Sequence, residues 1–340
     1  MRMQADKVLM NARCSHGVRL ARRSGHEGLL LLALVSPMVS PGQSAFAVSA
    51  PIQSVTANVT RPASPRVVVD GAGRRVKILA RVDRIVSLAP NLTETLYALG
   101  LGHRVVGDTT FCDVPEEAKT KPHVGAPVDP SVEAIVALRP DLVLATTSIN
   151  RPETVDALHH LGISVYTTSS QTVRGMIDSV GHIADLAGAE KQGAALTASL
   201  NARLEVLRNR LASDPPVRVL FVVWLDPLQS VGQNTFIADA LHWAGAESVV
   251  RSNQNWPQMS LEEVVRLQPD YFVFAASHSG EGAVSLDDLQ KRPVWKDLRA
   301  IREGHVAIVS DEIDRPDPGL IDAIEQLARD LHPKAFRDER

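Results

Sequence analysis

Two stretches of the chain, far apart in the sequence, share one pattern of apolar and polar positions. They are residues 131–144 and 260–273, and Glu262 lies 129 positions after Glu133. In each stretch apolar residues recur at helical spacing, a Pro-Asp pair follows, and a continuous apolar run comes last. This pattern is typical of a short helix that ends at a proline and leads into a strand buried on both faces. We therefore expect two similar halves.

Strand and helix patterns alternate along most of the chain. The alternating patterns lie on both sides of residues 172–213, a stretch rich in residues that favour helix. Within this stretch, one long helix is expected at residues 189–211. Alternation of this kind predicts parallel sheets covered by helices on both faces. We predict an α/β fold of two Rossmann-like lobes, residues 66–171 and 214–334, joined by the long helix, with a ligand cleft between the lobes.

The first fifty residues have the pattern of an export signal. Arginines precede the apolar run 28–35, and two small-x-small sites follow it. That order is typical of a secretory signal peptide, and the run is shorter than the about 20 residues of a retained membrane helix. We expect residues 1–50 to be a cleaved signal peptide and residues 51–65 a flexible mature N-terminus. The mature protein would be periplasmic, without a stable membrane anchor.

Composition and motifs narrow the function classes. The net charge is −3 and no basic stripe is present, which argues against a nucleic-acid partner. The chain has no Gly-x-Ser-x-Gly, phosphate-loop or His-Glu-x-x-His motif, so we expect neither an enzyme nor catalytic residues. The adjacent His159 and His160 would diverge on a helix, so no metal site is expected. Cys14 precedes the apolar run, so only Cys112 remains after cleavage, without a disulfide partner.

Candidate ligand-binding residues lie in loops beside predicted strands. Phe111 and Asp113 follow one strand, Trp256 precedes the second copy of the repeat, and Asp311 and Arg315 follow the last strand. Trp256 lies among Asn, Pro and Gln, and an aromatic ring in such a loop provides flat apolar contact area. The alternatives are that Trp256 is a core residue that anchors its loop, and that Asp311 and Arg315 form a surface ion pair.

Two segments carry a resemblance to a known family. Residues 84–94, Arg-Ile-Val-Ser-Leu-Ala-Pro-Asn-Leu-Thr-Glu, resemble the opening of solute-binding proteins that serve ABC importers of cobalamin, haem and iron-siderophores. The repeat around Glu133 and residues 255–262, Asn-Trp-Pro-Gln-Met-Ser-Leu-Glu, are similar to the cobalamin branch. The resemblance covers roughly residues 66–332. It implies two lobes, one long connecting helix and little hinge motion. In the first segment, Asn91 or Thr93 is expected to cap the helix that follows.

The resemblance also implies a ligand and a partner. Phe111, Trp256, Asp311 and Arg315 would contact a corrinoid. Glu133 and Glu262 would dock onto arginines of a dimeric permease, one glutamate from each lobe. An acidic residue in a first helical turn is favoured in any case by the helix dipole, and it is the repetition of the glutamate that supports docking. The sequence departs from well-known cobalamin binders at Pro127 and Thr146, where those proteins have tryptophans.

We therefore predict a monomeric periplasmic protein that captures cobalamin or a related corrinoid and delivers it to an ABC importer permease. Cobalamin would be the transported ligand, and no cofactor is expected. A haem or ferric-siderophore binder on the same fold is the nearest alternative. From another class, the chain could be a periplasmic metal-dependent enzyme or the ligand-binding subunit of a sensor.

Overall fold

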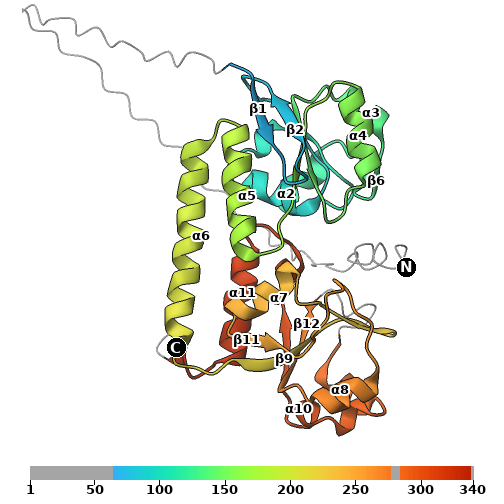
Figure 1. Ribbon diagram of the computed structural model, residues 1–340, viewed down its shortest axis with the longest axis vertical. Coiled ribbons are helices and arrows are strands. Elements are labelled where there is room, and N and C mark those ends of the chain that lie inside the picture. The colour runs from blue at the N-terminus through green and yellow to red at the C-terminus, as the bar shows by residue number, and fades with distance from the viewer. Residues whose placement is uncertain (1–63, 277–283, 338–340) are drawn as a thin grey trace, which may run out of the picture. The chain divides into compact units, whose positions relative to one another are not determined.

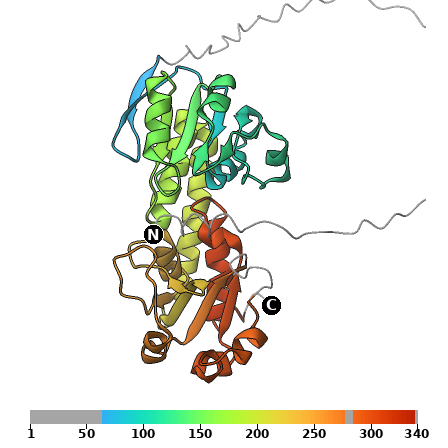
Figure 2. The same ribbon diagram turned by 90° about the vertical axis from the view of Figure 1, so that its right-hand side faces the viewer.

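The computed structural model describes residues 64–276 and 284–337 of the 340-residue chain. The predicted signal peptide lies outside the described residues, as does nearly all of the segment 51–65. Figures 1 and 2 show two α/β halves, which we call the N-lobe (from Arg66 to Thr168) and the C-lobe (from Val217 to Leu331). The predicted α/β fold with two parallel sheets is confirmed, whereas the predicted domain boundaries stay a prediction.

The N-lobe is built on a four-stranded parallel sheet. Its strand order is β4-β3-β7-β8, and every residue of β7 is buried, as expected of a strand covered on both faces. A hairpin of β1 and β2 precedes the sheet. The strands are β1 (Arg66–Val69), β2 (Arg75–Ile78), β3 (Ile85–Ser87), β4 (Val105–Gly107), β5 (Gly125–Ala126), β6 (Asp129–Pro130), β7 (Leu142–Thr146) and β8 (Val165–Thr168). The helices are α2 (Pro90–Ala98), α3 (Val132–Ala137), α4 (Pro152–His160) and the 3-10 turns η1 (Gly102–Arg104) and η2 (Glu116–Thr120).

The C-lobe repeats this plan with one antiparallel edge. Its order is β10-β9-β12-β13, with β11 also paired to β9, and only β10 runs antiparallel to its neighbour. The strands are β9 (Val217–Leu225), β10 (Leu228–Ser230), β11 (Ala246–Ser248), β12 (Tyr271–Ala275) and β13 (Val306–Val309). The helices are α7 (Phe236–Trp243), α8 (Leu261–Leu267), α9 (Leu286–Lys291), α10 (Arg299–Arg302), α11 (Leu320–Leu331) and the 3-10 turns η4 (Trp295–Asp297) and η5 (Asp311–Asp314).

Two helices, α5 (Val173–Leu186) and α6 (Glu190–Leu211), lie between the lobes in the sequence. Helix α6 has 22 residues and runs alongside both lobes (Figure 1). A β-carbon added to Gly193 would lie 2.4 Å from the Cβ of Ala184. Gly193, which weakens the helical pattern in the sequence, therefore permits a close approach of α5 and α6. None of the described helices is long and apolar enough to cross a membrane.

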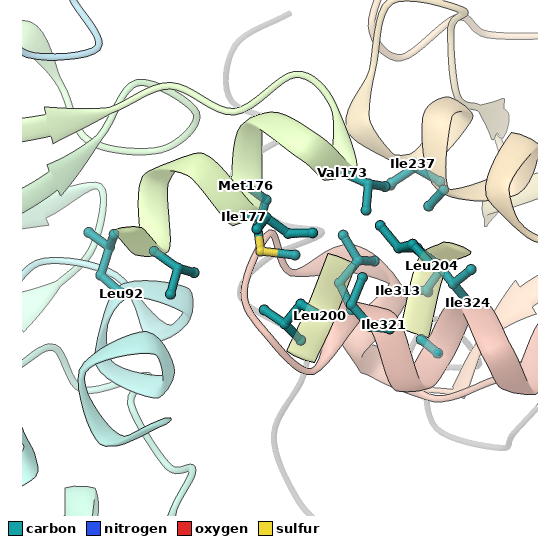
Figure 3. Close-up of a cluster of buried hydrophobic side chains, with 14 of the residues drawn as sticks. Leu92, Val173, Met176, Ile177, Leu200, Leu204, Ile237, Ile313, Ile321 and Ile324 are labelled. Carbon is teal, nitrogen blue, oxygen red and sulfur yellow. The ribbon is translucent and has the colours of Figure 1, made fainter. Parts of the chain in front are cut away.

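One apolar cluster extends through both lobes and the connecting helices. Leu92 of the N-lobe, Met176 of α5, Leu200 of α6 and Ile321 of the C-lobe are all members (Figure 3). At the start of α5 the backbone NH of Val173 donates to Oδ2 of Asp239 on α7, at 2.7 Å. Separating the lobes would expose this shared apolar surface to water. The packing therefore explains physically why little hinge motion is expected.

The expected cap of α2 is wrong. The N-cap is Ala89, Pro90 is the first helical residue, and no side chain caps this end. A proline is favoured there because it has no NH group to satisfy. Asn91 and Thr93 instead lie within the helix, and the Thr93 hydroxyl donates to Oγ of Ser87 at 2.8 Å. In the two repeated helices, by contrast, serines are the caps: Oγ of Ser131 and of Ser260 each accept a backbone NH at 3.1 Å.

Candidate functional site

The loop after β4 carries Phe111 and Asp113, and the residue between them anchors it. Sγ of Cys112 lies 3.1 Å from the hydroxyl of Thr93 and 3.2 Å from that of Thr109. Burial raises the pKa of the Cys112 thiol to about 11, so the thiol is neutral at physiological pH. Phe111 is half-buried and Asp113 is exposed. Cys112 therefore anchors the loop from within the protein, between a half-buried Phe111 and an exposed Asp113.

A second anchor of the same loop is a hydrogen bond between an aspartate and a histidine, which was not predicted from the sequence. Asp108 is fully buried, and its Oδ1 lies 2.8 Å from Nδ1 of His123. Burial raises the pKa of the Asp108 carboxyl to about 6, although His123 opposes that rise. The position of Asp108, directly after β4, was the signal in the sequence that could have identified it, because loops at the carboxyl ends of parallel strands form sites.

Asn150, also missed, holds together the ends of the N-lobe strands. Its Nδ2 donates to the carbonyls of Leu88, at 2.9 Å, and of Pro127, at 2.8 Å, and its Oδ1 accepts the NH of Thr146 at 2.7 Å. Pro127 and Thr146 are both buried. The two positions at which the resemblance would place tryptophans are therefore close together, and in this chain they belong to the scaffold.

In the C-lobe the predicted ligand residue Trp256 lies on a loop with a well-fixed backbone. The NH of Ser230 donates to the carbonyl of Pro257 at 3.0 Å, and the NH of Gly232 donates to that of Asn255 at 2.9 Å. A β-carbon at Gly232 would lie 1.8 Å from the carbonyl oxygen of Gln254, so only glycine fits there. Trp256 itself is 39 % exposed, which argues against the alternative of a core residue.

Arg315 contacts the other lobe. Its guanidinium lies 2.7 Å from a carboxylate oxygen of Glu94 on α2, and the two side chains are only 25 % and 11 % exposed. The amide of Asn91 adds a long bond of 3.4 Å to the carbonyl of Pro316. The bonded partner of Arg315 is thus Glu94 rather than Asp311. Sequence reasoning missed Glu94, although it ends the segment that carries the family resemblance.

A buried acid adjoins this pair. Asp317 is 1 % exposed and its Oδ1 accepts the NH of Gly319 at 2.8 Å, while Oδ2 has no partner among the described residues. Burial, and then the charge of Glu94, raises the pKa of Asp317 well above the usual value. Burial also raises the pKa of Glu94, against the opposing effect of Arg315. Two carboxyls share one guanidinium, which favours the retention of a proton between them.

Two of the predicted ligand residues, Asp113 and Asp311, act electrostatically on a third, Arg315. Burial disfavours the charged form of Arg315, but Glu94, Asp317, Asp113 and Asp311, in that order, raise its pKa electrostatically. The effect of Asp113, which belongs to the N-lobe, acts across the space between the lobes, whereas Glu94 contacts Arg315 directly. Trp256 belongs to another loop of the C-lobe. The described residues include no cluster of three or more His, Cys, Asp or Glu side chains placed to hold a metal ion.

The two predicted docking glutamates are exposed and charged. A backbone hydrogen bond and then the hydroxyl of Ser131 lower the pKa of Glu133, and the same two causes, with Ser260, lower that of Glu262. The Ser131 hydroxyl lies 3.1 Å from Oε2 of Glu133. Each lobe therefore presents a carboxylate in the first turn of an equivalent helix, α3 or α8.

Comparisons with known proteins point to one family. The family model for "Periplasmic binding protein" matches residues 85–312. An uncharacterized ABC transporter substrate-binding lipoprotein, YvrC of Bacillus subtilis, is 32 % identical over 81 % of this chain and 88 % of its own length. The crystal structure of the periplasmic vitamin B12 binding protein BtuF of Vibrio cholerae superposes with a TM-score of 0.67 at 26 % identity, covering 75 % of this chain and 98 % of that one.

A haem-binding relative is equally similar in structure. The periplasmic heme-binding protein RhuT from Roseiflexus sp. RS-1, in apo form, has a TM-score of 0.67 at 26 % identity and covers 75 % of this chain and 99 % of its own. The family model matches more than half of the chain, and the Bacillus relative is 32 % identical over 81 % of it, so the family of this chain is established. The chain belongs to the periplasmic binding protein family, and it is an extracytoplasmic, non-enzymatic solute-binding protein of an ABC importer.

Proposed function

We propose that the protein captures cobalamin or a related corrinoid between its lobes and delivers it to a dimeric permease. The observation that carries the choice of ligand is the charge around Arg315. The groups that act on this guanidinium are Glu94, Asp317, Asp113 and Asp311, all of them acids. Its positive charge is therefore compensated within the protein.

This balance discriminates between ligand classes. Haem carries two propionates, and ferric siderophores are commonly anionic, so both would meet unfavourable electrostatics near Asp113 and Asp311. A corrinoid carries amide side chains, whose NH groups can donate to those carboxylates. Trp256 provides an exposed aromatic surface for the apolar part of the macrocycle. The two solved structures do not discriminate between these ligands, because the vitamin B12 binding protein and the heme-binding protein are equally similar to this chain.

Absorption titration of the purified mature protein tests the ligand. Cyanocobalamin, haemin and a ferric catecholate siderophore are added separately, and saturable binding is measured by spectral change and by calorimetry. We expect saturable one-to-one binding of cyanocobalamin, with haemin and the siderophore bound at least tenfold more weakly. Tighter binding of haemin with a sharpened Soret band would establish the haem alternative instead.

Delivery would proceed by docking. Glu133 and Glu262 would each form a charge-assisted bond to an arginine of one permease subunit, which fixes orientation as well as contributing energy. A monomer can engage both halves of a two-fold symmetric dimer only if its own two lobes imitate that symmetry. The duplicated helices α3 and α8 provide such an imitation.

We also propose that the protein is released into the periplasm by signal cleavage, without the lipid anchor of the Bacillus relative. Cys14 lies before the apolar run of the leader rather than after a cleavage site. N-terminal sequencing of periplasmic material should begin near Val48 or Pro51. Recovery of the chain in membranes with the arginines of the leader still present would contradict this proposal.

A further inference from the structure

The two docking helices agree in more than their glutamates. Residues 131–139 and 260–268 have the same class of exposure at all nine positions. Both segments end in a residue with a left-handed backbone, Arg139 with φ 46° and Gln268 with φ 45°. Each end is held by an equivalent arginine: Arg84 donates to the carbonyl of Leu138 at 2.6 Å, and Arg218 donates to that of Leu267 at 2.8 Å. The surfaces that the two segments present are therefore closely matched.

A two-fold symmetric partner has two equivalent sites, and it can make the same contact at both only with side chains that the two copies share. Among the exposed positions, three are identical in the two copies and two differ. The differing pairs are Ala137 with Arg266 and Arg139 with Gln268; the identical pairs are Ser131 with Ser260, Glu133 with Glu262, and Val136 with Val265. The serines cap their helices, and the glutamates are the proposed docking charges, which leaves the valines without a role.

The valines are unusual for their position. Val136 is 40 % exposed and Val265 is 43 % exposed, so neither belongs to an apolar core. A β-branched residue on the exposed side of a short helix is also a weak helix former. Each valine lies three residues after its glutamate, which places the two side chains next to each other on the helix surface. Both copies thus present a carboxylate beside an apolar side chain.

We propose that Val136 and Val265 are a matched pair of apolar contacts, each of which packs against the same apolar surface on one subunit of the permease dimer, beside the cation that pairs with the glutamate. This inference rests on the proposed docking function and adds the chemistry of the partner's surface. The occupant is a two-fold symmetric dimer with two equivalent sites, each a basic group bordered by an apolar patch.

The positions that differ are compatible with this partner. On α8 the guanidinium of Arg266 lies 3.9 Å from a carboxylate oxygen of Glu263 on the same helix. On α3 the corresponding positions are Ala137 and Ala134, which are uncharged. The additional charges of α8 therefore compensate each other, so each helix keeps the charge of a single carboxylate. Just beyond α3, however, the first copy has the cation Arg139 where the second has the uncharged Gln268. Two equivalent basic sites can accept both copies.

The test measures binding of the purified protein, with and without added cyanocobalamin, to the permease of its own importer in nanodiscs. Val136→Thr and Val265→Thr keep the shape of the side chain but replace a methyl group by a hydroxyl. Each single variant should bind about fourfold more weakly, the loss expected for one methyl group kept from water, and the double variant about fifteenfold more weakly. Val206→Thr, at a valine of α6 that is 62 % exposed outside both copies, is the control and should bind normally.

Salt separates this contact from the charged one. Raising the ionic strength from about 0.1 to about 1 M shortens the screening length from about 10 to about 3 Å. The fold-loss of the threonine variants should persist at high salt, whereas that of Glu133→Gln and Glu262→Gln should shrink. Affinity for cyanocobalamin and the midpoint of thermal unfolding should stay unchanged in the threonine variants, which excludes misfolding as the cause.

The outcomes distinguish a failure of the apolar contact from a failure of the docking function. If the glutamate variants lose binding while both threonine variants bind normally, the matched apolar contact is wrong and docking stands. A loss at only one valine would likewise overturn the pairing, because a symmetric partner must respond to both. If the glutamate variants bind normally, the proposed docking function itself fails, whatever the valine variants do.

Discussion

The repeated helices and the proposed ligand loops of the two lobes contrast with each other. Helices α3 and α8 agree in serine cap, exposure and left-handed end. The proposed ligand loops differ in their side-chain anchors: backbone hydrogen bonds hold both loops, but the loop around Phe111 is also held by a buried thiol and an Asp-His pair. The two helices that would meet a symmetric partner resemble each other, whereas the two loops that would meet an asymmetric ligand do not.

The largest effect that this contrast predicts is at the docking glutamates. Reversing both charges with Glu133→Arg and Glu262→Arg should abolish complex formation with the permease and uptake of ligand, because two like charges would then meet at each site. Ligand affinity, measured by calorimetry, should barely change. A double variant that lost ligand binding but still supported uptake would assign the glutamates to the ligand site and contradict their proposed role in docking.

Removing the contact between the lobes should have the next largest effect, on stability. Arg315→Ala leaves the buried carboxyls of Glu94 and Asp317 without their cation, and we expect a loss of about 3 kcal/mol in the free energy of unfolding. Urea unfolding measures this loss. Adding Glu94→Gln should recover part of it, since the second variant removes one of the uncompensated acids. An unchanged midpoint would show that the pair contributes nothing net.

The anchor of the N-lobe loop should give a pH dependence. Because burial raises the pKa of Asp108 from 3.8 to about 6, the folded protein binds this proton more tightly than the unfolded chain. Its contribution is present below about pH 4 and is lost as the pH rises to about 6, a change of at most about 3 kcal/mol. Asp108→Asn should remove that part of the slope in unfolding experiments at successive pH values. An identical slope in the variant would assign the dependence to other groups.

The smallest effect concerns the aromatic surface of the C-lobe loop. Trp256→Ala should weaken cyanocobalamin binding about tenfold, or about 1.4 kcal/mol, because a flat apolar contact is lost. Trp256→Phe keeps most of that contact and is the matched control, with a loss of about threefold or less. Binding to the permease should be the same in both variants. Equal affinities of the alanine variant and the unaltered protein would remove Trp256 from the ligand site.

The sequence predicted the parts of the fold that depend on local patterns. The repeat and the long helix α6 follow from periodicity and from residue types within a few positions of each other. The cap of α2 was the exception. Both candidate side chains were of the right type there, but the helix begins at Pro90, so its N-cap, Ala89, lies two residues before Asn91 and four before Thr93.

The contacts between distant residues could not be predicted in the same way. Glu94 and Arg315 are separated by 221 positions, and nothing in the local pattern around either one indicates the other. The same holds for Asn150, whose three partners lie in three different segments, and for Cys112, which looked like a spare thiol. Each depends on which loops the fold brings together, which is decided by the packing of the whole core.

Because glycine has no side chain, Gly193 affects the geometry with which the protein would dock onto the permease. Because a methyl group at this position would overlap Ala184, the glycine allows α5 and α6 to cross closely, and this contact helps to set the direction of α6. Helix α6 is long, so a small change of angle at its first turns becomes a large displacement at its far end. In the proposed complex, the span between Glu133 and Glu262 has to equal the spacing of two fixed arginines. In that complex, the absence of a side chain at Gly193 would help to set the distance between the two docking glutamates.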